Sequence, residues 1–175
     1  MKKFQFLLLD AGPVLKLFEL GIWGKFIEKC EVTITRTVVQ QECLYYEEDG
    51  VRYNINFPFE QATQQGHIKI VDVNPSEAKQ AIDKLNHLNY DIHSGEKETI
   101  AFFLKSSEDF RICAADGAVF RFLGYIGKGE KGISLEEVLN KTGLGGQLEW
   151  RFTKKFRDKF TKIGQADKIQ NTKLP

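Results

Sequence analysis

The sequence predicts a single α/β domain, built around a parallel sheet with helices on both sides, on the strength of three observations. Short apolar runs, such as Phe4 to Leu9 and Phe110 to Ala115, have the length and composition of buried parallel strands. Segments with helical spacing or capping signals follow the strands along the chain, and this alternation is typical of parallel sheets. At 175 residues, of which 42% are hydrophobic, the chain is about one domain long and can bury a core of its own.

Charge and cysteine content narrow the classes of function. Lys and Arg number 25 against 24 Asp and Glu, so any attraction for nucleic acid must be local. The three cysteines are far apart and form no Cys-x-x-Cys pair, which argues against a disulfide framework or a zinc knuckle. No apolar stretch approaches the roughly 18 residues of a membrane span, and Asp10 interrupts the first one. We therefore expect a soluble, cytoplasmic protein without a membrane partner.

The first segment is predicted to form a strand followed by helices. Asp10 directly follows the apolar run and lies at the tip of this strand. Gly12-Pro13 then starts a helical stretch, because proline suits the first turn of a helix. Gly21 and Gly24 interrupt the helical spacing, so two short helices are expected here.

The next segment is predicted to continue the same alternation. Val32 to Ile34 is expected to be the second strand, and Thr37 the N-cap of a helix over Val38 to Glu48 that carries Glu42 near its start. Asp49-Gly50 is a turn signal. A strand or extended arm is predicted beyond it from the alternation of Val51, Tyr53, Ile55 and Phe57.

The middle of the chain contains another predicted strand and two helices. His67 to Val73 has the composition of a strand. Asn74-Pro75 is a cap and first-turn pair that opens a helix over Ser76 to Leu88. Ser94-Gly95 is expected to cap a further helix, Glu96 to Leu104.

The last part of the chain begins with Phe110 to Ala115, which is predicted to be the final core strand and ends in Asp116. A helix is expected over residues 118 to 123, and Ser134 opens a capping box with Glu137 at the start of the next helix. Trp150 to Ile163 is predicted to be the last helix. Loops are expected at the Gly-rich stretches 124 to 132 and 143 to 146.

Four acidic residues are candidate metal ligands. Asp10 and Asp116 close two apolar strands, while Glu42 and Glu96 lie near the starts of helices. In a parallel α/β fold with right-handed crossovers, all four can converge at one edge of the sheet, where ligands bind. Carboxylates crowd together only if their repulsion is offset, and Mg²⁺ or Mn²⁺ with oxygen ligands is the usual means. Such ions assist the in-line hydrolysis of a phosphodiester.

Four segments carry these acids, and in order and spacing they resemble the acidic motifs of the PIN-domain family. They are LLLDAGPVLKLFELG, TVVQQE, HSGEKETIAFFL and ICAADGAVFRFLG, within about residues 4 to 126. The resemblance implies a three-layer fold and a ribonuclease that depends on Mg²⁺ or Mn²⁺ held by Asp10, Glu42, Glu96 and Asp116. Many members of the family are toxins of VapC-type toxin–antitoxin modules. RNA is thus the implied substrate, with an antitoxin protein or a second copy of the chain as partner.

The resemblance also suggests finer features. GEKETIAF is similar to the third motif of one PIN subgroup. By this resemblance Glu96 would bind the metal, and Glu98 would support the ligands without contacting the metal. Relatives often carry Thr, Ser or Asp just before the last acid, whereas this chain has Ala114 and Ala115, which removes one source of support for Asp116. A nuclease core is expected over 1–126, with an insertion at about 43–66, and a helical extension packed on it over 127–175. The aromatic segment Cys43 to Phe59 is expected to border the cleft or a dimer interface.

Less specific interpretations of the acids and of the histidines stay open. Each of the four acids could cap a helix or be solvated, because acids are common near helix N-termini. The histidines lack metal-ligand spacing and are expected to be structural; they are His67, His87 and His93.

The C-terminal helix has an apolar stripe formed by Phe152, Phe156, Phe160 and Ile163. Around it lie basic residues, of which Lys154, Lys155, Arg157 and Lys159 are candidates for contact with a nucleic-acid backbone. The alternatives are that the stripe packs on the domain with its lysines solvated, or that it docks onto a partner.

Two other functions compete with the nuclease. Phosphatases of the haloacid dehalogenase type also begin with an apolar strand that ends in Asp, but they need a second Asp two residues on, where this chain has Gly12. The other rival is a PIN-like module that binds RNA or protein without cutting. The presence of all four acids favours catalysis.

Overall fold

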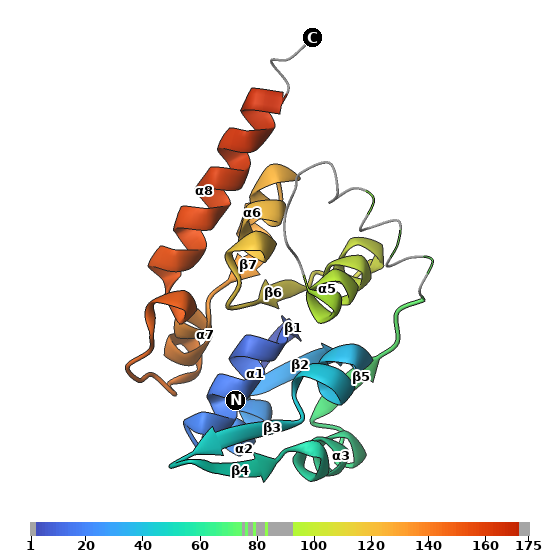
Figure 1. The fold of residues 1–175 in the computed structure, drawn as a ribbon, viewed down its shortest axis with the longest axis vertical. Coiled ribbons are helices and arrows are strands. Elements are labelled where there is room, and N and C mark those ends of the chain that lie inside the picture. The colour runs from blue at the N-terminus through green and yellow to red at the C-terminus, as the bar shows by residue number, and fades with distance from the viewer. Residues whose placement is uncertain (1–2, 75, 77–78, 80–82, 84–92, 172–175) are drawn as a thin grey trace.

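A computed structural model of the chain describes residues 3–74, 76, 79, 83 and 93–171. Its central element is a five-stranded sheet in which all neighbouring strands are parallel (Figure 1). The strands in spatial order are β5 (Ile68–Val71), β2 (Cys30–Thr35), β1 (Phe4–Leu9), β6 (Arg111–Cys113) and β7 (Gly132–Ile133). The prediction of an α/β fold around a central parallel sheet is confirmed.

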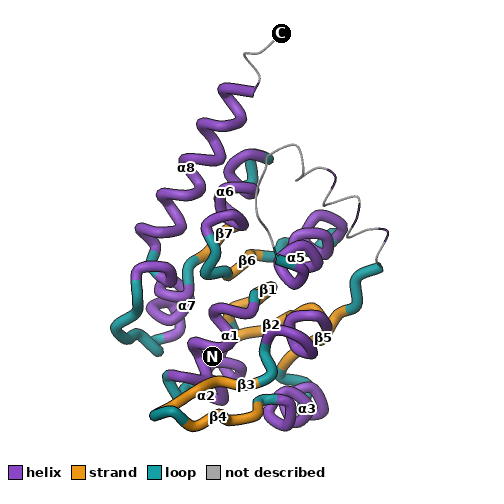
Figure 2. Tube along the Cα trace, viewed as in Figure 1, coloured by secondary structure: helices purple, strands orange, loops and turns teal. Residues whose placement is uncertain are grey.

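The apolar run of β1 is buried from both sides of the sheet. Leu7 and Leu9 belong to one hydrophobic cluster, Leu8 belongs to a second, and all three are fully buried. Successive side chains of a strand point to opposite faces, so the two clusters lie on opposite faces of the sheet. Helices therefore cover both faces and the domain has three layers (Figure 2).

Each cluster is completed by its own set of helices. The cluster of Leu7 and Leu9 includes residues of α1 (Ala11–Glu19), α2 (Trp23–Lys29), α3 (Asn56–Gln64) and α7 (Leu135–Thr142). The cluster of Leu8 includes residues of α5 (Ser94–Lys105), α6 (Gly117–Tyr125) and α8 (Lys154–Asn171). The two short helices expected after the first strand are thus confirmed as α1 and α2.

Helix α8 packs along α6 through glycines (Figure 1). A methyl group at Gly164 would overlap the backbone carbonyl of Arg121, and one at Gly124 would overlap that of Thr161. An ion pair of 2.6 Å between Arg121 Nε and Asp167 Oδ2 joins the same two helices. Among the described residues, no helix is both long enough and apolar enough to cross a membrane.

The segment 38–54 differs from its prediction. Instead of a helix over 38–48, the chain makes a short π-helical turn, η1 (Val38–Glu42), and then an antiparallel hairpin of β3 (Tyr45–Glu48) and β4 (Val51–Asn54). A hairpin forms here instead of the predicted helix because Asp and Gly readily adopt positive φ. Asp49 and Gly50 have φ of 51° and 77°, the left-handed pair of a tight hairpin turn. The adjoining residues Tyr45 and Tyr46 also favour strands over helices. The predicted strand beyond the turn ends at Asn54, and residues 56–64 are helical.

Other boundaries also shift. Helix α5 has His93 as its N-cap, one residue before the predicted Ser94. The last helix begins at Lys154 after a separate 3₁₀ turn, η3 (Trp150–Phe152), and continues past Ile163 to Asn171. Strand β7 was not predicted, because its two residues lie at the end of a glycine-rich stretch, and the sheet thus takes its last strand from beyond residue 126. The predicted helix over 76–88 lies mostly outside the described residues.

Candidate metal centre

The carboxyl edge of the sheet carries a cavity of about 390 Å³. Asp10 and Asp116 reach it from the ends of β1 and β6, and Glu42 and Glu96 reach it from η1 and α5. The sequence prediction that these four acids converge is therefore confirmed. The other residues that line the cavity are Ala11, Gly12, His93, Ser94, Ala115 and Arg151.

Asp10 is the most enclosed of the four acids. Its backbone N–H donates to the carbonyl of Cys113 at 3.0 Å, which fixes the end of β1 against β6. The side chain is 4% exposed, and Oδ1 has no hydrogen-bond partner among the described residues. Burial, followed by the nearby charge of Glu96, raises the pKa of Asp10 well above its ordinary value. A buried carboxylate oxygen without a donor requires a proton or a cation.

Glu96 lies in the first turn of α5 and is also buried, with 5% of its surface exposed. Its Oε2 accepts a hydrogen bond from the backbone N–H of His93 at 3.0 Å, so the side chain caps the first turn of the helix. The same hydrogen bond fixes the carboxylate at the cavity. Burial, and then the charge of Asp116, raise the pKa of Glu96 from 4.5 to about 7.

These raised values give the metal-free protein a defined pH dependence. Between about pH 4.5 and about pH 7, folded Glu96 retains a proton that the unfolded chain has released, so the free energy of unfolding should fall as pH rises through this window. Glu96→Gln should flatten this slope, whereas Glu98→Gln, a half-buried neighbour on the same helix, should leave it unchanged. Urea unfolding in EDTA across the window measures both variants. Equal slopes for the wild type and Glu96→Gln would contradict the burial of an uncompensated acid.

Glu42 is positioned by the backbone of α5. Its Oε1 accepts the N–H of Gly95 at 2.9 Å, which places a carboxylate at the positive end of this helix. Gly95 permits the approach, because a Cβ there would lie 2.6 Å from Cδ of Glu42. The glycine is thus required for close contact and not for an unusual backbone conformation.

Gly95→Ala should therefore displace Glu42 without weakening the helix, since alanine favours helices more than glycine does. If Glu42 is a metal ligand, the Mn²⁺ affinity should fall on the order of tenfold to a hundredfold, as for other groups that orient a ligand. Titration calorimetry with Mn²⁺ measures the change. Gly24→Ala is the matched control, because a Cβ at Gly24 meets no atom within 4 Å. Equal affinities for the two variants would remove Glu42 from the ligand set.

Asp116 combines two of the roles considered for it. It is the N-cap of α6, and its Oδ1 accepts the N–H of Ala118 at 2.6 Å. The same carboxylate lines the cavity. Capping therefore fixes its orientation and does not remove it from the site.

Other predicted site residues lie elsewhere. Glu98 is half-buried on α5 and does not line the cavity. Lys154 Nζ pairs with Asp158 at 2.6 Å, and Arg157 pairs with Glu137 at 2.8 Å, so both charges are engaged within the protein. Lys155 and Lys159 are exposed on α8.

No described side chain of the aromatic insertion lines the cavity either. Its Phe59 is buried in the core, and Tyr46 stacks on Phe18 at 5.9 Å and on Tyr53 at 5.1 Å. Tyr45 and Tyr53 are more than 40% exposed. A role for this segment in dimer formation stays a prediction.

Sequence reasoning missed three polar residues of the cavity, His93, Ser94 and Arg151. His93 was expected to be structural, and its backbone N–H does donate to Oε2 of Glu96. Arg151 belongs to η3, far along the chain from the acids, in the segment that the sequence predicts as the start of the last helix. No sequence pattern links Arg151 to the four motifs.

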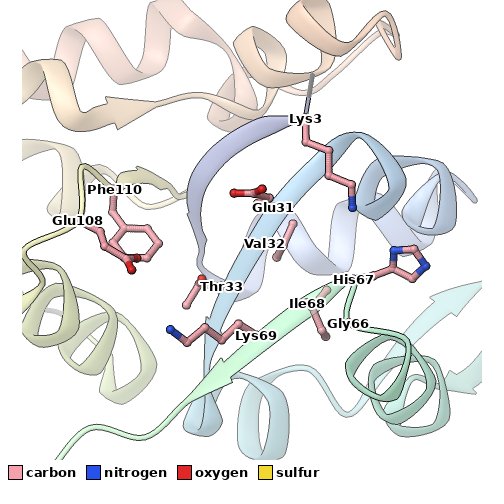
Figure 3. A pocket seen from close by; sticks show the side chains of 10 residues that line it. All are labelled: Lys3, Glu31, Val32, Thr33, Gly66, His67, Ile68, Lys69, Glu108 and Phe110. Atoms are coloured by element: carbon pink, nitrogen blue, oxygen red, sulfur yellow. The ribbon is translucent and has the colours of Figure 1, made fainter. Parts of the chain in front are cut away.

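A second cavity, of about 430 Å³, lies at the opposite edge of the sheet, around the first residues of β2 and β5 (Figure 3). It is lined by side chains of both signs, among them Lys3, Glu31, Lys69 and Glu108. None of the predicted site residues lies there. The acidic cavity is therefore the candidate site, although it is the smaller of the two.

The candidate ligand atoms of the acidic cavity are of the kind that binds Mg²⁺ or Mn²⁺. All four are carboxylates, which such ions prefer, and the unpartnered Oδ1 of Asp10 is an available ligand atom. Within the described part of the chain, no three Asp, Glu, His or Cys side chains form a ready-made ion-binding group, so the carboxylates would have to draw together around an ion. No protein-family model and no curated protein matches this chain.

Proposed function

We propose that this chain is a divalent-metal-dependent ribonuclease of the PIN type that hydrolyses phosphodiester bonds of RNA. The observation that carries the proposal is the pair of buried acids, Asp10 and Glu96, which share one cavity with Glu42 and Asp116. Burying like charges opposes folding, and strongly shifted acids in a cleft are typical of functional sites.

Each acid has a role that follows from its surroundings. Asp10 and Glu96 would provide the inner ligands, because burial keeps water from competing for them. Glu42 and Asp116 would complete the set, held in place by the N–H groups of Gly95 and Ala118. When bound, Mg²⁺ or Mn²⁺ supplies a Lewis acid that makes water nucleophilic and offsets charge on the phosphodiester.

The rival functions fit less well. A phosphatase of the haloacid dehalogenase type would need an acid at residue 12, where this chain has Gly12; a Cβ there would lie 2.7 Å from that of Ala115, so a side chain would force the two segments apart. A module that binds RNA without cutting gains nothing from four carboxylates, which repel phosphates unless a cation offsets them. Neither rival accounts for the buried acids.

The test is cleavage of single-stranded RNA by the purified chain in Mg²⁺ or Mn²⁺. Cleavage should stop in EDTA and resume when the ion is restored. Cleavage that survives EDTA, or its absence in both ions, would reject the proposal. A toxin role makes a separate prediction, namely that a small gene for a DNA-binding antitoxin lies directly upstream.

A further inference from the structure

The turn η3 brings a positive charge to the acidic cavity. Arg151, its middle residue, lines the cavity together with the four acids. It comes from the C-terminal part of the chain, whereas all four acids come from the first 116 residues. The described lining residues thus include four acidic side chains and one arginine, with no lysine.

The charge of Arg151 is only weakly engaged within the described structure: after the hydrogen bond from Lys16, it is a minor cause of the lowered pKa of Glu149. No carboxylate there forms an ion pair with it, in contrast to Arg157 and Arg121, which pair with Glu137 and Asp167. Its guanidinium carbon lies 4.8 Å from the centroid of the Phe152 ring. Its guanidinium is therefore available to bind an anion at the cavity.

The turn itself is firmly held. Phe152 is fully buried and anchors the turn in the core. Glu149, just before the turn, pairs with Lys16 of α1 at 2.6 Å, and the N–H of Lys154, just after it, donates to Glu136 of α7 at 2.7 Å. Arg151 is thus presented from a fixed backbone, which lowers the entropy lost on binding a ligand.

An exposed aromatic ring lies beside the arginine. Trp150 is 51% exposed, and its ring meets Phe156 edge-on at 5.9 Å. Phe156 contacts Phe160 at 4.7 Å, and Phe160 packs so closely on Gly117 that a Cβ there would lie 2.6 Å from the ring. This row of rings connects the exposed indole to the residue that follows Asp116.

We propose that η3 is a substrate-binding lip for single-stranded nucleic acid, in which Arg151 binds a backbone phosphate next to the bond that is cut and Trp150 stacks on a neighbouring base. The inference rests on the proposed ribonuclease function. A guanidinium binds phosphate through paired hydrogen bonds, and it would offset the repulsion between the phosphate and the acids. An indole stacks on any base that is not already stacked in a duplex, so the lip selects for single strands.

Binding is tested in Mg²⁺ with Asp116→Asn as the background, so that a labelled single-stranded RNA is not consumed. Adding Arg151→Ala should weaken binding roughly tenfold. It should also reduce the slope of log affinity against log salt concentration by about one, as expected for the loss of one phosphate contact. Arg151→Lys should restore part of the affinity, because lysine keeps the charge but not the paired hydrogen bonds. The matched control is Arg111→Ala, which removes an exposed arginine at the start of β6, on the opposite edge of the sheet.

Kinetics separate binding from structural damage. With the four acids intact, Arg151→Ala should raise KM more than it lowers kcat, and its thermal unfolding should match that of the control. Trp150→Ala should weaken the binding of single-stranded RNA several-fold, on the order expected for one stacked base, with little effect on a duplex of the same sequence.

Failure of the lip and failure of the proposed function give different results. Equal RNA affinity and salt dependence for Arg151→Ala and Arg111→Ala would overturn the lip, even if the wild type cuts RNA in an EDTA-sensitive way. A wild type that cuts no RNA in either ion would overturn the ribonuclease. In that case, weaker RNA binding by Arg151→Ala alone would still support the lip.

Discussion

Asp10→Asn should reduce the hydrolysis of single-stranded RNA on the order of a hundredfold or more, without lowering the stability of the metal-free protein. The substitution keeps the shape of the side chain and removes one negative ligand. Loss of the ligand weakens both the binding of the ion and its positioning against the phosphodiester, and errors in positioning are costly in catalysis. Asp116→Asn should act in the same direction, and its amide oxygen can still cap α6.

The stability of Asp10→Asn should be unchanged or increased, because the native carboxylate is buried and has its pKa raised by burial and by Glu96. A neutral side chain removes this penalty. Thermal melting in EDTA, together with cleavage rates in Mg²⁺, measures both effects on the same preparation. Activity and stability should therefore change in opposite directions.

The matched control is Asp49→Asn, at the turn of the hairpin. Asp49 is exposed, and its φ of 51° suits asparagine equally well, so neither activity nor stability should change. Asp10→Asn cleaving as fast as this control would remove Asp10 from the catalytic site. Loss of activity accompanied by an equal loss of stability would point to a structural role instead.

Gly164→Ala should destabilise the protein by about 3 kcal/mol, the upper range for overpacking a core. The added methyl group would overlap the carbonyl of Arg121 and lie 2.9 Å from the backbone N of Tyr125. Both atoms belong to the backbone of α6, so no rotation of a side chain can relieve the contact. The two helices must separate, which also loosens the packing of α8 around Phe156 and Phe160.

Urea unfolding of Gly164→Ala, compared with Gly24→Ala, measures this effect. Both substitutions place alanine within a helix, but a Cβ at Gly24 meets no atom within 4 Å. Gly24→Ala should leave the free energy of unfolding unchanged or raise it slightly, because alanine favours the helix. Equal stabilities for the two variants would show that the close contact between α6 and α8 is absent in solution.

The sequence predicted the parallel core because its strands are marked by local patterns. The apolar runs before Asp10 and Asp116 are short, as is typical of buried strands, and parallel strands bring their carboxyl ends to one edge. That rule was sufficient to place both aspartates in one cavity. Ser134 likewise fixed the start of α7, because a capping box is a local signal, and its hydroxyl does accept the N–H of Glu137 at 3.2 Å.

The remaining features depend on long-range contacts that the sequence does not encode locally. The hairpin after Glu42 competes with a helix of similar local preference, and the turn at Asp49 decides between them. Arg151 reaches the cavity only because Phe152 is anchored in the core and Lys16 holds Glu149. Such a position follows from tertiary packing, which no spacing of residues predicts.

The most direct test of the central claim, that the four carboxylates hold a divalent cation, is a calorimetric titration of the purified protein with Mn²⁺. The wild type should bind Mn²⁺, and Asp10→Asn and Asp116→Asn should each bind it at least about tenfold more weakly, because each loses a negative ligand. Asp49→Asn should bind the ion like the wild type. No binding by the wild type, or equal binding by all four proteins, would contradict the claim that these carboxylates form a metal centre.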